Sequence, residues 1–127
     1  MTDLVVDASA VLAVALREPG WEPVQPALIG SFICAVNAAE VVSRYMKHGV
    51  SKLQTEIVLR RMRMMIEPLD AARALEVGAL HRATRVRGLS IGDCACLALA
   101  KARGLPALTA DRAWAGLDVG VQIQLIR

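Results

Sequence analysis

Short apolar runs recur along the whole chain, and their spacing limits the folds open to it more than any other feature does. The runs occupy residues 4–6, 32–34, 66–69, 106–109 and 121–126. Runs of this length that contain β-branched residues are typical of strands buried in a parallel sheet. The chain is therefore expected to build its core around a sheet of short strands.

Segments with a helical spacing of apolar residues lie between these runs. The expected helices are residues 8–17, 21–29, 37–48, 51–65, 71–86 and 90–103. Strands that alternate with helices predict a mainly parallel sheet with right-handed crossovers and helices on both faces. Because the 127 residues contain no linker or repeat, we expect one domain, residues 1–127, of the three-layer α/β/α class with a short central sheet.

The composition excludes several classes of protein. Hydrophobic residues make up 55% of the chain, which rules out intrinsic disorder as its main state. Aromatic residues make up 3%, too few for a platform that stacks bases. No apolar run reaches the roughly 20 residues of a membrane span, and the segment around Asp3 lacks the basic start of a signal peptide. Three cysteines, an odd number, argue against a disulfide framework, so we expect a cytoplasmic protein with no membrane partner.

Four acidic residues with apolar neighbours fall at comparable places along the predicted fold. Asp7 follows the first run, and Asp111 lies just past the run at residues 106–109. Glu40 is expected in the first turn of the helix after the second run, and Asp93 in the first turn of the helix before the fourth. In an open parallel sheet, the strand C-termini and the N-termini of returning helices share one edge, where ligands bind. The four carboxylates are therefore expected to meet at that edge.

Each of these acids, taken singly, also has an ordinary explanation as a helix cap. Asn37 precedes Glu40 by three residues, as in a capping box, and the surroundings of Asp93 are similar. Asp7 and Asp111 suit plain N-caps. Four anions in one apolar crevice repel one another, however, and a bound cation relieves that repulsion. Mg²⁺ or Mn²⁺ suits an all-oxygen site, whereas Zn²⁺ is disfavoured because no histidine joins the cluster.

Carboxylates that hold a divalent ion favour hydrolysis of a phosphodiester bond, since the ion activates water and offsets the charge of the phosphate. Asp7, Asp93 and Asp111 are expected to hold the ion jointly, with Glu40 nearby or in contact through water. No side-chain nucleophile is then needed.

The distribution of positive charge bears on the substrate. The net charge is only +3, but residues 41–66 contain six basic residues and a single acid, Glu56. A solvated helix face explains this cluster as well as a polyanion-binding surface does. If the second explanation holds, Arg60, Arg61 and Arg63 are the candidate contacts with RNA phosphates.

Four segments of the chain resemble a PIN domain, and more closely the VapC-type ribonuclease toxins of bacterial toxin–antitoxin pairs. They are residues 5–10 (VVDASA), 37–41 (NAAEV), 89–94 (LSIGDC) and 108–114 (LTADRAW). Each segment alone is weak, but the four in this order and spacing are specific, and the match runs nearly end to end. The resemblance implies a catalytic site made of Asp7, Glu40, Asp93 and Asp111, with Ser9 and Thr109 in support.

The resemblance also implies a PIN-like fold, Mg²⁺- or Mn²⁺-dependent endoribonuclease activity on RNA, a homodimer, and a cognate antitoxin that blocks the site. Cys94 departs from the pattern, since relatives often carry a basic residue there. The helices between residues 37 and 65 carry more apolar surface than a sheet flank needs, which separately favours a homodimer. Two alternatives stay open: a PIN nuclease of RNA processing without an antitoxin, and a non-catalytic module that docks an arginine-bearing partner in its acidic pocket.

Overall fold

The five apolar runs form the strands of one sheet, with the first strand at its centre. The structure is a computed structural model that describes residues 3–127. The strands are β1 (Val5–Val6), β2 (Phe32–Cys34), β3 (Met65–Glu67), β4 (Ala107–Thr109) and β5 (Ile123–Leu125). They are ordered β3-β2-β1-β4-β5, and every pairing is parallel, which confirms the predicted α/β class.

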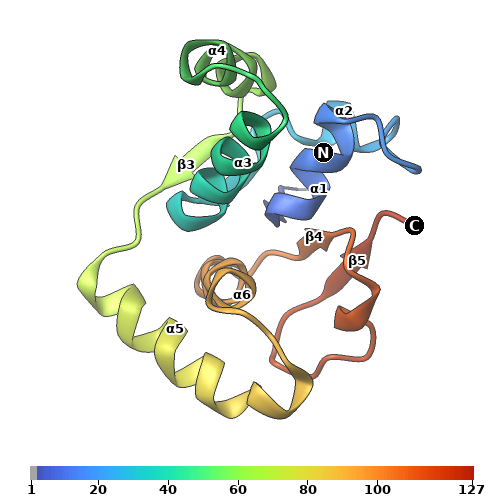
Figure 1. The fold of residues 1–127 in the computed structure, drawn as a ribbon. Coiled ribbons are helices and arrows are strands. Elements are labelled where there is room, and N and C mark those ends of the chain that lie inside the picture. The colour runs from blue at the N-terminus through green and yellow to red at the C-terminus, as the bar shows by residue number, and fades with distance from the viewer. Residues whose placement is uncertain (1–2) are drawn as a thin grey trace.

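Helices cover both faces of the sheet and complete the three predicted layers (Figure 1). The helices on one face are α1 (Ala8–Ala15), α2 (Val24–Ala27), α3 (Ala35–Lys47) and α4 (Lys52–Met62). The helices on the other face are α5 (Ala71–Ala83) and α6 (Ile91–Arg103), and short 3₁₀ turns form η1 (Arg85–Arg87) and η2 (Arg112–Trp114). No helix within residues 3–127 combines the length and the apolar character that crossing a membrane requires.

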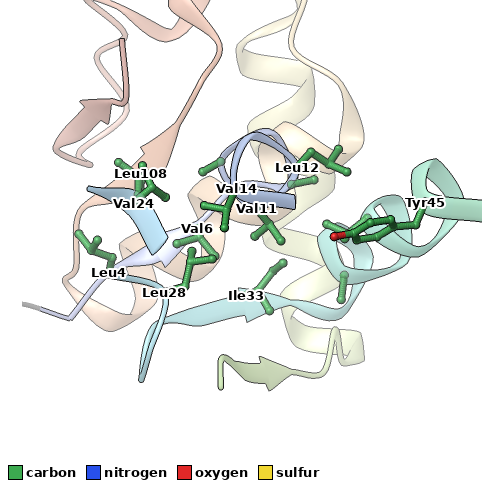
Figure 2. Close-up of a cluster of buried hydrophobic side chains, with 14 residues drawn as sticks. Leu4, Val6, Val11, Leu12, Val14, Val24, Leu28, Ile33, Tyr45 and Leu108 are labelled. Carbon is green, nitrogen blue, oxygen red and sulfur yellow. The ribbon is translucent and has the colours of Figure 1, made fainter. Parts of the chain in front are cut away.

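Alternation along the central strand divides the core between the two faces. Val6 belongs to the cluster that α1, α2 and α3 cover, together with Ile33 and Leu108 (Figure 2). Val5 belongs to the opposite cluster, which α6 covers and which includes Trp114. Both valines are completely buried, because successive side chains of a strand point to opposite faces and both faces are covered.

The most deeply buried helix is α6. Every residue from 94 to 100 is buried, and most of these side chains are small, with Ala, Cys and Leu alone in that stretch. Such a helix packs closely on the sheet and has little freedom to move. Its first turn is therefore a rigid support for Asp93.

Several helix boundaries differ from the prediction, and one of them affects the site. α3 begins at Ala35, two residues earlier than expected, because Cys34 at the end of β2 is already its N-cap. Glu40 therefore lies in the second turn of α3 and not in the first. α4 ends at Met62, where Arg63 turns into the left-handed region (φ 56°). α2 and α5 are shorter than predicted at one or both ends.

Candidate active site

The carboxylate of Asp7 lies at the centre of the sheet edge where the strands end. The backbone N–H of Asp7 donates to Leu108 O at 2.9 Å, which continues the pairing of β1 with β4 by one residue. Although Asp7 is the N-cap of α1, its side chain caps nothing. Instead, Oδ2 accepts hydrogen bonds from Ser9 Oγ at 2.6 Å and from Thr109 Oγ1 at 3.0 Å. The capping explanation is therefore wrong for Asp7.

Ser9 and Thr109 connect Asp7 to the turn that carries Asp111. Ser9 Oγ accepts from the N–H of Ala110 at 2.9 Å, and Thr109 Oγ1 accepts from the N–H of Asp111 at 3.0 Å. Each hydroxyl thus receives one hydrogen bond from the turn after β4 and donates one to Asp7. This arrangement ties the first acid to the last, although about one hundred residues separate them in sequence.

Asp93 and Asp111 are held by the helix ends that contain them. Asp93 Oδ2 accepts from the N–H of Ser90 at 2.9 Å, and the N–H of Asp93 donates to Ser90 Oγ at 3.0 Å, which forms a capping box. Asp111 Oδ1 accepts from the N–H of Ala113 at 2.9 Å and caps η2. The capping explanation is confirmed for these two acids. It does not compete with a functional role, because each cap occupies only one carboxylate oxygen.

Glu40 is positioned by a buried amide that the sequence did not identify as functional. Asn37 is completely buried, and its Nδ2 donates to Glu40 Oε1 and to the carbonyl oxygen of Gly92, each at 2.9 Å. A Cβ atom on Gly92 would lie 2.5 Å from Glu40 Oε1. Asn37 therefore orients Glu40 and joins α3 to α6, and the glycine leaves room for the carboxylate.

The four acids line one cavity of about 770 Å³. Asp7 is buried, Asp93 is half-buried, and Glu40 and Asp111 are exposed. Each carboxylate accepts its hydrogen bonds through one oxygen only, and within residues 3–127 no donor reaches the second oxygen. The structure thus brings the four predicted residues together, with one oxygen of each left for a ligand.

Burial and negative charge both act on Asp7. The pKa of Asp7 is raised from 3.8 to about 6: burial is the largest cause and the negative charges of Asp93 and Glu40 add to it, while the hydrogen bonds from Ser9 and Thr109 act in the opposite direction. Near neutral pH the carboxylate is ionised at a cost that a nearby cation would offset. The site therefore favours a positively charged ligand.

The donor set suits a hard divalent cation. Within residues 3–127, no three acidic, histidine or cysteine side chains stand close enough to surround one ion by themselves. Mg²⁺ characteristically binds through one or two carboxylates and keeps several water ligands, so it does not require such a cage. The four acids offer only oxygen ligands, one free carboxylate oxygen each, around an open cavity. Such a set of ligands fits a hydrated Mg²⁺ or Mn²⁺ ion.

The arginines predicted to contact RNA lie elsewhere. Arg60 pairs with Glu56 at 2.9 Å beside a groove next to α3, and Arg61 lines a groove next to α2. Arg63 lies at the end of α4. None of the three lines the cavity of the four acids, whereas Arg44 does.

Two residues of the site were missed by reasoning from the sequence, and both left a signal. The sequence pattern predicts Asn37 as the start of a capping box with Glu40, whereas in the structure its amide bonds the Glu40 side chain and the Gly92 carbonyl. Gly92 lies inside a predicted helix, where glycine is unfavourable by about 1 kcal/mol relative to alanine and indicates a close approach.

Cys94 is buried against Thr84, with Sγ 3.6 Å from Oγ1, so it does not line the cavity.

Comparison with solved structures identifies relatives of the same fold. A toxin–antitoxin complex from Klebsiella pneumoniae is 17% identical, with a TM-score of 0.76, and the alignment covers 100% of this chain and 98% of that one. A DNA-bound VapBC from Salmonella typhimurium is 15% identical, with a TM-score of 0.74 and full coverage of both chains. VapC20 of Mycobacterium tuberculosis, a toxin that cleaves the sarcin–ricin loop, is 14% identical, with a TM-score of 0.75 and coverage of 95% and 99%.

At these identities, the likeness to solved structures establishes the fold alone. No curated protein matches the chain by sequence. The sequence profile of the PIN domain, however, matches residues 4–119, a span that contains all four acids. The chain therefore belongs to the PIN domain family.

Proposed function

We propose that this protein is a metal-dependent endoribonuclease that acts as the toxin of a toxin–antitoxin pair. One observation carries the proposal: four carboxylates, from the residue after β1, from α3, from α6 and from the turn after β4, line one cavity, and each is oriented through a single oxygen. Membership of the PIN family supports nuclease chemistry at this cavity.

Asp7, Asp93 and Asp111 would hold Mg²⁺ or Mn²⁺, one or two of them directly and the rest through water ligands of the ion, with Glu40 nearby. When bound, the ion supplies a Lewis acid that makes water more acidic and offsets negative charge on the phosphate. The chain's own residues prepare the site: Ser9 and Thr109 fix the orientation of the Asp7 carboxylate through its Oδ2.

Glu40 is the acid best suited to a proton transfer. It is exposed, and Asn37 holds its Oε1 at 2.9 Å, so the carboxylate has a defined orientation with Oε2 left free. A carboxylate placed in this way is able to orient an attacking water molecule and to accept its proton. Asp111, also exposed, follows β4, which lies on the other side of β1 from β2, and it lines the same cavity.

The partners follow from the same proposal. The relatives from Klebsiella pneumoniae and Salmonella typhimurium are complexes of a toxin with an antitoxin, which supports a cognate antitoxin for this chain. The three cysteines form no disulfide, which suits the reducing cytoplasm. RNA as the substrate and a homodimer complete the proposal.

The deciding experiment is an RNA cleavage assay with purified protein. Mixed cellular RNA is incubated with Mg²⁺, with Mn²⁺ or with excess EDTA, and the products are separated on a gel. We expect cleavage with either ion, none in EDTA, and a loss of at least a hundredfold for Asp7→Asn. Asp118→Asn is the matched control, because Asp118 is an exposed carboxylate outside the cavity. Cleavage in excess EDTA, or by the Asp7 variant at full rate, contradicts the proposal.

A second experiment separates a toxin from an RNA-processing nuclease and from a docking module. Expression of a toxin should arrest growth in a manner that requires Asp7, and co-expression of a small adjacent gene should restore growth. Cleavage without growth arrest favours a processing nuclease. Absence of cleavage, together with tight binding of an arginine-bearing partner, favours a docking module.

A further inference from the structure

A stripe of side chains on α3 extends the acidic site in one direction. Glu40, Arg44 and His48 follow one another at intervals of four residues, so they lie on the same face of the helix and its C-cap. All three line the cavity that also contains Asp7. Along the helix axis, Arg44 lies about 6 Å and His48 about 12 Å beyond Glu40. Along α3, the lining of the cavity therefore changes from a carboxylate to a guanidinium and then an imidazole.

The guanidinium group of Arg44 is available for a ligand. Arg44 is exposed and forms no salt bridge within residues 3–127, although Glu40 lies only one turn away. Arg127 lines the same cavity, and its Nη1 donates to the carbonyl oxygen of Pro19 at 2.8 Å. Glu18 is the one acid of the lining that stands outside the group of four. Arg44, His48 and Arg127 thus each bring a hydrogen-bond donor to the lining of the cavity, and none of them forms an ion pair in the described chain.

We propose that Arg44, assisted by His48 and Arg127, forms a subsite for a phosphate that flanks the scissile phosphodiester of an RNA chain. The proposal rests on the proposed nuclease function. A polynucleotide with one phosphate at the carboxylates carries further phosphates away from them on either side, and Arg44 is the first basic residue beyond Glu40 on the face of α3 that lines the cavity. A guanidinium binds phosphate through paired N–H donors, which gives position as well as charge.

The subsite is tested by RNA binding in a protein that does not cut. In the Asp7→Asn background, binding of a short fluorescein-labelled single-stranded RNA is measured by fluorescence anisotropy at several KCl concentrations. Arg44→Ala should raise Kd about tenfold, since a hydrogen-bonded charge contributes roughly that much. It should also reduce the slope of log Kd against log salt by about 0.7, the value for one phosphate of a single strand. Arg44→Lys, which keeps the charge, should keep the slope.

Arg82→Ala is the matched control, because it removes the same charge from an exposed position on α5, outside the cavity. Equal Kd values and salt slopes for the Arg44→Ala and Arg82→Ala variants overturn the subsite, even if the protein with Asp7 intact cleaves RNA. If that protein does not cleave RNA but Arg44 still controls binding, the nuclease proposal fails, and Arg44 is a phosphate contact with no scissile bond beside it. Absence of RNA binding by the Asp7→Asn protein overturns the subsite outright. Thermal unfolding curves identify any variant that is not folded.

Discussion

Gly92 and Glu40 face each other so closely that a Cβ atom on Gly92 would lie 2.5 Å from Glu40 Oε1. The same oxygen accepts the hydrogen bond from Asn37, so the glycine and the asparagine together define where the carboxylate lies. Because the carboxylate is the end of a flexible side chain, an added methyl group at position 92 displaces it without disturbing the backbone.

Gly92→Ala is therefore expected to reduce RNA cleavage at least tenfold while the protein stays folded. Alanine is favoured over glycine in a helix by about 1 kcal/mol, which offsets the lost hydrogen bond, so the free energy of unfolding should change little. Cleavage rates and urea unfolding of the same preparations check the two expectations.

Two controls make this prediction specific. Gly78→Ala changes another helical glycine that has no atom within 4 Å of the added Cβ, so it should leave cleavage unchanged. In a Glu40→Ala background, Gly92→Ala should lower the residual activity no further, because its effect passes through Glu40. Fully additive losses in that background would show that Gly92 acts by another route.

Asp7 is expected to make the metal-free protein less stable as the pH rises. Its pKa is raised to about 6 in the folded protein, against an ordinary value of 3.8, so the folded state binds the proton more tightly than the unfolded state. Below pH 3.8 the folded and the unfolded states both carry the proton, so Asp7 does not lower the free energy of unfolding. Between pH 3.8 and about pH 6 the destabilisation by Asp7 grows, and above pH 6 it is constant at about 3 kcal/mol.

Asp7→Asn removes the destabilisation that the buried, ionised Asp7 carboxylate causes in the metal-free protein. In EDTA, the variant should therefore exceed the wild type in free energy of unfolding by about 3 kcal/mol above pH 6, and by nearly nothing below pH 3.8. Urea denaturation across this pH range measures the difference, and Asp118→Asn should show no such gain. A difference that does not vary with pH would refute the explanation.

The arginines of α4 and its C-cap are expected to make an outlying contact with RNA. Replacing Arg60, Arg61 and Arg63 together by alanine should weaken binding and flatten its salt dependence. Per residue the effect should be smaller than for Arg44, because these side chains lie outside the cavity and Arg60 already pairs with Glu56. Binding that stays unchanged at every salt concentration would leave them as a solvated helix face.

Homodimer formation is expected to use the apolar side chains of α3 and α4 that the core does not bury. Val41 and Tyr45 are buried in the core, but Met46, Leu53 and Ile57 are 47%, 67% and 43% exposed. Leu53→Asp should shift the mass measured by light scattering from dimer to monomer, since burying one leucine contributes about 2 kcal/mol. Leu75→Asp, on α5, should not. A monomeric wild-type protein that cleaves RNA would show that the dimer is dispensable.

Local patterns in the sequence were enough to predict the elements of this fold and the edge of the sheet at which its acids gather. The apolar runs and the capping serines are local signals: Ser51 and Ser90 each bond residues only three positions ahead. Parallel strands place their C-termini at one edge whichever strands are neighbours, so the meeting of Asp7, Glu40 and Asp111 did not require the sheet order. Interactions that span a few residues, together with the handedness of the crossover, were sufficient.

Which side chains orient those acids, and which basic residues lie beside them, depends on contacts between distant parts of the chain. Asn37 bonds Gly92 across 55 residues, and Ser9 bonds Ala110 across 101. Such contacts depend on how close α3 packs against α6 and β1 against β4, which is set by the volumes of many core side chains at once. The choice of Arg44 over Arg61 has the same origin, because both belong to one basic stretch and only the packing of α3 and α4 turns the first toward the cavity.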